Sequence, residues 1–170
     1  MEARWSRRAL APKWVAWPPG EQVNAGSEIA FRRATPGDAE AVAELSGQLG
    51  YPMAADLVRN RLATLTVSPD HAIIVAELNG AMCGWVHVHA QQSLVSGERG
   101  AILGLVVSRE FRRRGIGRLL MEEAERWVRG RGLDEVVLRS NVARSESHAF
   151  YPAIGYDQFR TQAVYRKRLP

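Results

Sequence analysis

The stretch from Ile102 to Val128 constrains the fold more than any other part of the sequence. Ile102 to Val107 is an apolar run interrupted only by Gly104 and bounded by polar residues, which is typical of a buried strand. From residue 116 onward, apolar residues recur every three or four positions, as on one face of a helix that ends near Gly130. The segment between them is polar and rich in arginine. The sequence therefore predicts a central strand, a basic turn and a long helix in succession.

The basic turn is suited to binding an anion. The first N–H groups of a helix lack partners within the helix, and the helix dipole makes that end positive. Gly115 and Gly117 have no Cβ atom, so a phosphate can approach the backbone closely. Flanking arginines add side-chain charge at Arg112, Arg113, Arg114 and Arg118. The pattern favours a pyrophosphate site, and the competing interpretation is a basic surface turn that starts an ordinary helix.

Two common phosphate motifs do not fit this turn. A P-loop requires Gly-x-x-x-x-Gly-Lys-Ser/Thr, and the chain contains no such run. A dinucleotide fingerprint requires a third glycine and an acid at the end of the next strand. Position 120 is a leucine, and the next predicted strand ends in Leu138-Arg139-Ser140-Asn141 without an acid.

Length and composition exclude several classes of protein. A chain of 170 residues, 46% hydrophobic and 24% charged, is typical of one globular domain. No apolar run reaches membrane length, and we expect a cytoplasmic protein without membrane contact. The net charge is +5, but the arginines are dispersed and no nucleic-acid-binding motif accompanies them. The single cysteine, Cys83, lies in an apolar strand pattern and is expected to be a buried, inert thiol.

Along the chain, periodicity and turn residues predict an N-terminal extension over residues 1–27 and one domain over residues 28–170. The extension contains three tryptophans, which favours docking on the domain or on a partner subunit. Asn79-Gly80 between two strand patterns predicts a hairpin. Strands are expected at 28–33, 71–78, 81–90, 102–107, 134–139, 156–159 and 161–167, and helices at 35–48, 54–65, 115–130 and 143–150. Residues 91–97 are expected to form a loop.

Three segments of the chain resemble the GNAT family of N-acetyltransferases, and they occur along the chain in the same order as in that family. They are Arg112-x-x-Gly115-x-Gly117, the opening Ile29-x-Phe-Arg-x-Ala-Thr-x-x-Asp38, and the ending that runs from Asn141 through His148-Ala-Phe-Tyr151 to Gly155-Tyr156. The resemblance covers residues 28–169 and implies an α/β fold with a mixed (α+β) sheet in the order β-α-α-β-β-β-α-β-α-β-β. It implies transfer of an acetyl group from acetyl-CoA to a primary amine, by direct attack in a ternary complex. The alternative is a non-catalytic acyl-CoA-binding or regulatory module on the same fold.

The family pattern assigns the cofactor-binding residues. It places the pantetheine arm against the backbone of Leu105, Val106 and Val107, and a bulge at Gly104 would free those main-chain groups. It places the pyrophosphate on the turn formed by Arg112, Arg113, Arg114, Gly115, Ile116, Gly117 and Arg118. Asn141 is expected to bond the pantetheine arm, or alternatively to be the N-cap of the next helix.

The resemblance makes Tyr151 the general acid that protonates the leaving thiolate, with a core aromatic as the competing role. Pro152 departs from the family pattern, because proline disfavours the α conformation of the preceding residue. No general base is evident, since Glu77 and Glu98 are weak candidates. His87 and His89 share a strand face with Trp85. They could act as a base through water, but the favoured interpretation is that they are half-buried sheet histidines. Two histidines without a third ligand do not make a metal site, and none is predicted.

The acceptor is expected to enter past the loop Gly50–Asp56 and to be lined by Tyr51, Met53, Trp85 and the Gln91–Gly97 loop. These residues are mixed apolar and polar, so they do not indicate the charge of the acceptor. A small amine, an amino-sugar antibiotic and a protein N-terminus all remain open as acceptors. Homodimers are common in the family, so a homodimer is one expected assembly.

Overall fold

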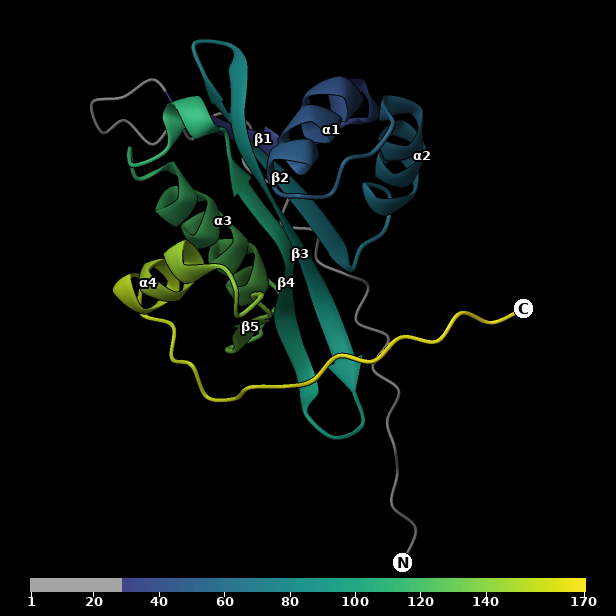
Figure 1. Ribbon diagram of the computed structural model, residues 1–170, viewed down its shortest axis with the longest axis vertical. Helices are drawn as coiled ribbons and strands as arrows, with labels where there is room; N and C mark the ends of the chain where they lie inside the picture. The colour runs from purple at the N-terminus through teal and green to yellow at the C-terminus, as the bar shows by residue number, and fades with distance from the viewer. Residues whose placement is uncertain (1–28) are drawn as a thin grey trace, which may run out of the picture.

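A computed structural model describes residues 29–170, in which a five-stranded sheet lies between two layers of helices (Figure 1). The strands are β1 (Ile29–Arg33), β2 (His71–Leu78), β3 (Ala81–Ser93), β4 (Gly97–Val107) and β5 (Val136–Leu138), in that spatial order. The first four pair antiparallel, and β5 pairs parallel with β4. The sheet is therefore mixed, as expected. The predicted extension, residues 1–27, lies outside the described residues.

Each face of the sheet is covered by two helices (Figure 1). One face packs against α1 (Ala39–Gln48) and α2 (Ala55–Leu65), and the other against α3 (Ile116–Gly130) and α4 (Ser145–Ala153). Alternation along β2 and β3 supplies both cores, because successive strand residues point to opposite faces. Within residues 29–170, no helix has both the length and the apolar character needed to cross a bilayer.

The hairpin between β2 and β3 confirms the prediction from Asn79-Gly80. Asn79 has φ 52° and Gly80 has φ 79°, so both residues are left-handed, as a type I′ turn requires. The ladder then contains one register shift, between Ala76 and Glu77. Beyond that shift His71 lies opposite His89.

The prediction of a loop over residues 91–97 is wrong. The β3–β4 ladder continues through the pairs Gln91–Arg99, Gln92–Glu98 and Ser93–Gly97, so residues 94–96 alone join the two strands. The residues of this extension are polar, so a prediction based on buried apolar residues missed it. The two strands are held together here by backbone hydrogen bonds to each other. The hairpin tip consequently lies at the opposite end of β4 from Val107.

The two predicted C-terminal strands are not formed. No strand follows α4, and residues 157–170 are exposed throughout. Large apolar side chains in this segment face solvent: Phe159, Val164, Tyr165 and Leu169. The prediction rested on alternating apolar residues, which fit the two faces of a strand. A strand also needs a neighbouring strand to share its backbone hydrogen bonds. The segment has no such neighbour among the described residues.

Asp38 is expected to make the stability of the domain depend on pH. Arg32 donates hydrogen bonds to both carboxylate oxygens of Asp38, at 2.9 and 2.7 Å, and these hold its pKa at about 2, below the usual 3.8. The folded state favours the charged carboxylate, so the stabilisation is complete above about pH 4 and is lost as the pH falls towards 2. Asp38→Asn should therefore destabilise the protein by about 1–2 kcal/mol at pH 7, after allowance for the partly exposed Arg32 side chain.

Urea unfolding at pH 7 and near pH 2 measures this difference. Asp56, which is exposed at the start of α2, provides the control substitution Asp56→Asn. A deficit for Asp38→Asn that stays the same at both pH values would contradict the expectation.

Candidate active site

A bulge in β4 opens the sheet at its centre. His87 on β3 lies opposite Gly104, but the next residue, Val88, lies opposite Ile102, so Leu103 is the extra residue. On the other side, β4 pairs with β5 only from Gly100 to Ile102. From Leu103 to Val107 the edge of β4 that faces β5 therefore has no strand partner. The bulge and the freed edge expected at Gly104 are confirmed.

Gly104 is needed where it is because the Trp85 ring fills the space beside it. A Cβ atom on Gly104 would lie 2.7 Å from this ring. Trp85 itself is 9% exposed and belongs to the core under α1 and α2. The bulge and the tryptophan pack against each other, so little of Trp85 is exposed to line the expected acceptor pocket.

The three predicted pantetheine-binding residues lie on this freed part of β4. Val106 is buried in the core under α1 and α2, whereas Leu105 and Val107 pack towards α3. Their side chains are thus core residues, while the main-chain edge that faces β5 is open to an added strand-like ligand. One polar side chain reaches this edge, because Arg112 Nε donates to the Val107 carbonyl at 3.4 Å.

The turn after β4 curls so that its amide groups gather at the start of α3. Arg113 has φ 60° and Gly115 has φ 80°, so two residues of the turn are left-handed. Such turns make a concave nest of N–H donors, and a non-glycine residue in this conformation is strained. Leu119 donates the first helical hydrogen bond, to Gly115, and no side chain caps the helix. The amides of residues 116–118 are therefore free of helical partners.

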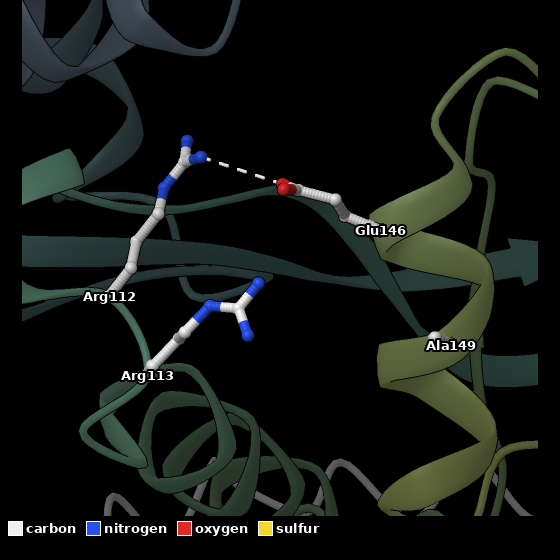
Figure 2. A pocket seen from close by; sticks show the side chains of 4 residues that line it. All are labelled: Arg112, Arg113, Glu146 and Ala149. Atoms are coloured by element: carbon white, nitrogen blue, oxygen red, sulfur yellow. Dashed lines mark ion pairs between the residues drawn. The ribbon is translucent and has the colours of Figure 1, made fainter.

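The arginines of the turn do not all face the same way. Arg112 and Arg113 line a pocket of about 440 Å³ together with Glu146 and Ala149 of α4. Figure 2 shows Arg112 reaching towards Glu146, with 3.5 Å between Nη1 and Oε2, and Arg113 extending below that ion pair. Arg114 lies over the Phe111 ring and Arg118 pairs with Glu122, so both are engaged locally.

Gly117 lies in the gap between the end of β4 and α4. A Cβ atom at this position would lie 3.4 Å from the Phe150 ring and 3.6 Å from a methyl group of Val107. A larger side chain would therefore fill the space between the freed β4 edge and α4. The free amides at the start of α3 and this gap together form a cradle, and its unpaired N–H donors suit an anionic ligand.

Asn141 shapes the turn after β5. Its Oδ1 atom accepts a hydrogen bond from the Ala143 amide at 2.9 Å, and its carbonyl accepts one from the Arg144 amide at 2.9 Å. The N-cap position of α4 is Arg144, so the alternative role of Asn141 as an N-cap is wrong. Its amide NH₂ group makes no hydrogen bond within residues 29–170.

Tyr151 is helical in spite of the proline that follows it. Helix α4 runs to Ala153, and Pro152 lies in its last turn, where the missing N–H removes one hydrogen bond at most. The Tyr151 ring packs edge-on against Phe150 and Tyr156, at 5.1 and 6.1 Å between centroids. Burial raises the pKa of Tyr151, and the positive charge of Arg144 opposes that rise. Tyr151 is partly exposed, and within residues 29–170 its hydroxyl makes no hydrogen bond.

Tyr156 has a structural role. Its hydroxyl donates to Glu125 Oε1 at 2.8 Å, and the ring packs against the core under α3. Burial, together with this hydrogen bond, raises the pKa of Tyr156. It therefore joins α3 to the end of α4.

Neither candidate carboxylate lies at the bulge as a free base. Glu77 accepts hydrogen bonds from Arg32 within the Arg32–Asp38 network. Glu98 is exposed near the hairpin tip, six residues from Gly104, which is about 20 Å along a strand. The interpretation of either as a general base is therefore not supported by the geometry.

The histidines form a cluster that the sequence pattern did not show in full. His71 Nδ1 and His87 Nε2 are 3.0 Å apart, and His71 stacks on His89 at 4.2 Å. Burial and the neighbouring histidine charges lower the pKa of His87 to about 4, so it is neutral at pH 7. The half-buried state expected for His87 and His89 is confirmed. Within residues 29–170, no group of three or more His, Cys, Asp or Glu side chains is arranged to hold a metal ion.

The loop between α1 and α2 contains two of the residues that were expected to line the entry of the acceptor. Tyr51 is 60% exposed, whereas Met53 packs partly into the core and accepts a hydrogen bond from Arg61 at its sulfur. Residues 91–97, expected to join this lining, lie at the other end of β4 and do not. Cys83 is fully buried, as expected, and burial raises the pKa of its thiol.

Residues 40–156 match the model of the acetyltransferase (GNAT) family. The chain belongs to this family. It is 29% identical over 161 residues to the aminoglycoside N(6')-acetyltransferase type 1 of Klebsiella aerogenes, a match that covers 94% of this chain and 88% of the relative. It is 32% identical over 95 residues to the mycothiol acetyltransferase of Thermobispora bispora, which covers 55% of this chain but about a third (32%) of that relative.

The fold agrees with solved members of the GNAT family. The aminoglycoside N-acetyltransferase AAC(6')-Iy, solved with a bisubstrate analogue that contains coenzyme A, superposes with a TM-score of 0.75 at 21% identity. The alignment covers 84% of this chain and all of that one. The predicted family and fold are thus confirmed. Acetyl-CoA is the cosubstrate of the family, in agreement with the cradle at the start of α3.

Proposed function

We propose that this protein transfers an acetyl group from acetyl-CoA to the primary amine of a small molecule, by direct attack in a ternary complex. The observation that carries the proposal is the uncapped start of α3, which follows two left-handed residues and adjoins the freed edge of β4. The amides of residues 113–118 would hold the pyrophosphate, with Arg112 and Arg113 beside it. The backbone of Leu105–Val107 and the amide of Asn141 would hold the pantetheine arm.

In the proposed reaction the neutral amine attacks the thioester carbonyl, a C–N bond forms, and the C–S bond breaks. The Tyr151 hydroxyl gives its proton to the leaving sulfur and is protonated again from solvent. Because Glu77 and Glu98 are engaged or distant, the proton lost by the amine passes to water in this scheme. Tyr151 is suited to the acid role because its raised pKa keeps it protonated at neutral pH.

The two arginines beside the acceptor loop outnumber its one exposed carboxylate, Asp56, and so favour an amine on a neutral or anionic molecule. Arg144 lies over the Tyr51 ring and Arg61 contacts Met53, so two guanidinium groups flank this loop. Cationic side chains repel a polycation such as an aminoglycoside. An aminoalkylphosphonate N-acetyltransferase of Salmonella typhimurium, 29% identical over 138 residues, is named for an acceptor of the favoured kind.

Thiol release from acetyl-CoA across a panel of amines tests the proposal. The panel contains an aminoglycoside, an aminoalkylphosphonate, a neutral amino sugar and a peptide with a free N-terminus. We expect turnover with at least one small amine, and highest with a neutral or anionic one. Tight acetyl-CoA binding in calorimetry with no turnover on any amine would instead support the alternative, a non-catalytic acyl-CoA-binding module.

We further propose that the protein assembles as a homodimer through residues 157–170. These residues expose Phe159, Val164, Tyr165 and Leu169, and their alternating pattern suits a strand that lacks a neighbour. A second copy offers that neighbour and covers the apolar side chains. Sedimentation should show a dimer for the full chain and a monomer after truncation at Tyr156. A monomeric full chain, or a dimer that survives truncation, would contradict this assembly.

A further inference from the structure

Arg144 lies where the acceptor-side loop meets the helix that carries Tyr151. It is the N-cap residue of α4, and its Nη2 atom donates to the Leu49 carbonyl at 2.7 Å across 95 residues of sequence. Its guanidinium also lies over the Tyr51 ring, with its carbon 5.8 Å from the ring centroid. A Cβ atom on Gly50, which is left-handed at φ 94°, would lie 3.9 Å from the same nitrogen. Three consecutive loop residues thus adjoin one side chain.

The partner of Arg144 is the negative end of a helix. Leu49 is the C-cap residue of α1, and the last carbonyls of a helix have no partners within it. A cation at this end is favoured by the helix dipole, and a hydrogen bond from a charged donor is stronger than a neutral one. Within residues 29–170, Arg144 forms no ion pair with an acidic side chain, so no carboxylate competes for this contact.

A second contact holds the same end of α1 to a residue that follows β4. The Arg109 amide, at the start of the basic turn, donates to Gln48 Oε1 at 3.0 Å. The end of α1 is therefore tied both to the segment that follows β4 and to the segment that precedes α4. These two segments flank the freed edge of β4. The acceptor-side loop is thus held by contacts to two segments that are distant from each other in sequence.

The same guanidinium also influences the tyrosine two helical turns further along α4. Positions 144, 148 and 151 fall on one side of a helix. The positive charge of Arg144 works against the effect of burial on Tyr151, so it stabilises the tyrosinate left after proton donation. The titratable groups that face Tyr151 from the packed elements are Arg144 and, through ring contact, Tyr156.

We infer that Arg144 is a positioning residue that holds the acceptor-side loop at a fixed place relative to Tyr151. By fixing Leu49 to Tyr51 against the start of α4, it presents the acceptor amine where the thioester and the acid meet. This inference rests on the proposed function, because it takes Tyr151 as the acid and the α1–α2 loop as the entry for the acceptor.

Arg144→Gln and Arg144→Lys test the inference in the full chain, with Arg139→Gln as the matched control. Arg139 is exposed on the same segment and forms no ion pair or side-chain hydrogen bond within residues 29–170. For Arg144→Gln we expect the acceptor KM to rise about 10- to 100-fold, the usual effect of losing a charged hydrogen bond. The Kd of acetyl-CoA should stay within about twofold, because Arg144 is not in the phosphate cradle. Arg144→Lys should recover part of the KM, since it keeps the charge and one donor.

Hydrogen exchange of residues 47–54 in the free protein gives a readout that needs no substrate. The amides of this loop should exchange faster in Arg144→Gln and be unchanged in Arg139→Gln. Unchanged exchange, or an unchanged acceptor KM in an active enzyme, overturns the inference. Faster exchange in a protein that acetylates none of the amines would refute the proposed function while leaving the contact between Arg144 and the loop established.

Discussion

Replacing Gly117 with leucine is expected to abolish acetyl-CoA binding while the domain remains folded. A Cβ atom at this position already lies 3.4 Å from Phe150 and 3.6 Å from Val107, so the rest of a leucine must occupy the gap beside the freed β4 edge. Two or more charged hydrogen bonds between the main chain and the pyrophosphate would be lost. The Kd of acetyl-CoA should rise at least about 100-fold in calorimetry.

Gly130→Leu is the matched control, because Gly130 lies at the other end of the same helix with open space around it. Leucine is a better helix former than glycine by roughly 0.5–1 kcal/mol, so both variants should keep the helical circular dichroism of the parent. A folded Gly117→Leu protein that binds acetyl-CoA as tightly as the parent would show that the cradle does not bind acetyl-CoA. The proposed use of acetyl-CoA would then lose its support.

Tyr151→Phe is expected to lower kcat by about 100- to 1000-fold, within the usual range for general acid–base catalysis. The phenyl ring keeps the packing against Phe150 and Tyr156, so the Kd of acetyl-CoA and the melting temperature should change little. Because burial raises the pKa of Tyr151 above its usual value, the parent enzyme should keep its acid protonated through the neutral and mildly alkaline range. Its kcat should therefore show no decline from this group between pH 7 and 9.

Tyr156→Phe separates chemistry from packing. This variant loses the hydrogen bond to Glu125, so it should be less stable by about 1 kcal/mol but retain the kcat of the parent. If Tyr151→Phe turns over a good acceptor at the parental rate, or if Tyr156→Phe shows the larger loss of kcat, then the acid has been assigned to the wrong tyrosine.

The sequence alone predicted the parts of the fold that depend on local pattern. Apolar periodicity located the strand at 71–78 and the helix that starts at residue 116, and Asn79-Gly80 located the hairpin. Local conformation decides these features, because glycine and asparagine adopt the left-handed region and an amphipathic helix has one apolar face. The motif around Gly115 and Gly117 located the turn with free amide donors at the start of α3 for the same reason: it is built from main-chain groups within a few residues of one another.

Strand register and strand pairing depend on partners distant in sequence, so they could not be predicted from the sequence. A two-residue hairpin by itself pairs His71 with Val88, and the shift between Ala76 and Glu77 brings His71 opposite His89. One extra residue in a ladder moves every later pair, so the histidine cluster could not be read from spacing. The prediction of two C-terminal strands was wrong for a similar reason, because strand propensity at residues 156–167 does not supply a neighbouring strand.

The candidate site also combines features set by local sequence with features set by tertiary packing. The sequence by itself determined the turn that gathers amide donors, since Arg113 and Gly115 lie within one bend of the chain. Only the tertiary structure decided that Glu77 is engaged by Arg32, that Trp85 lies under the bulge, and that Arg144 reaches Leu49 across 95 residues. The physical reason is range: backbone conformation is set by neighbours in sequence, whereas the burial and partners of a side chain are set by packing between elements distant in sequence.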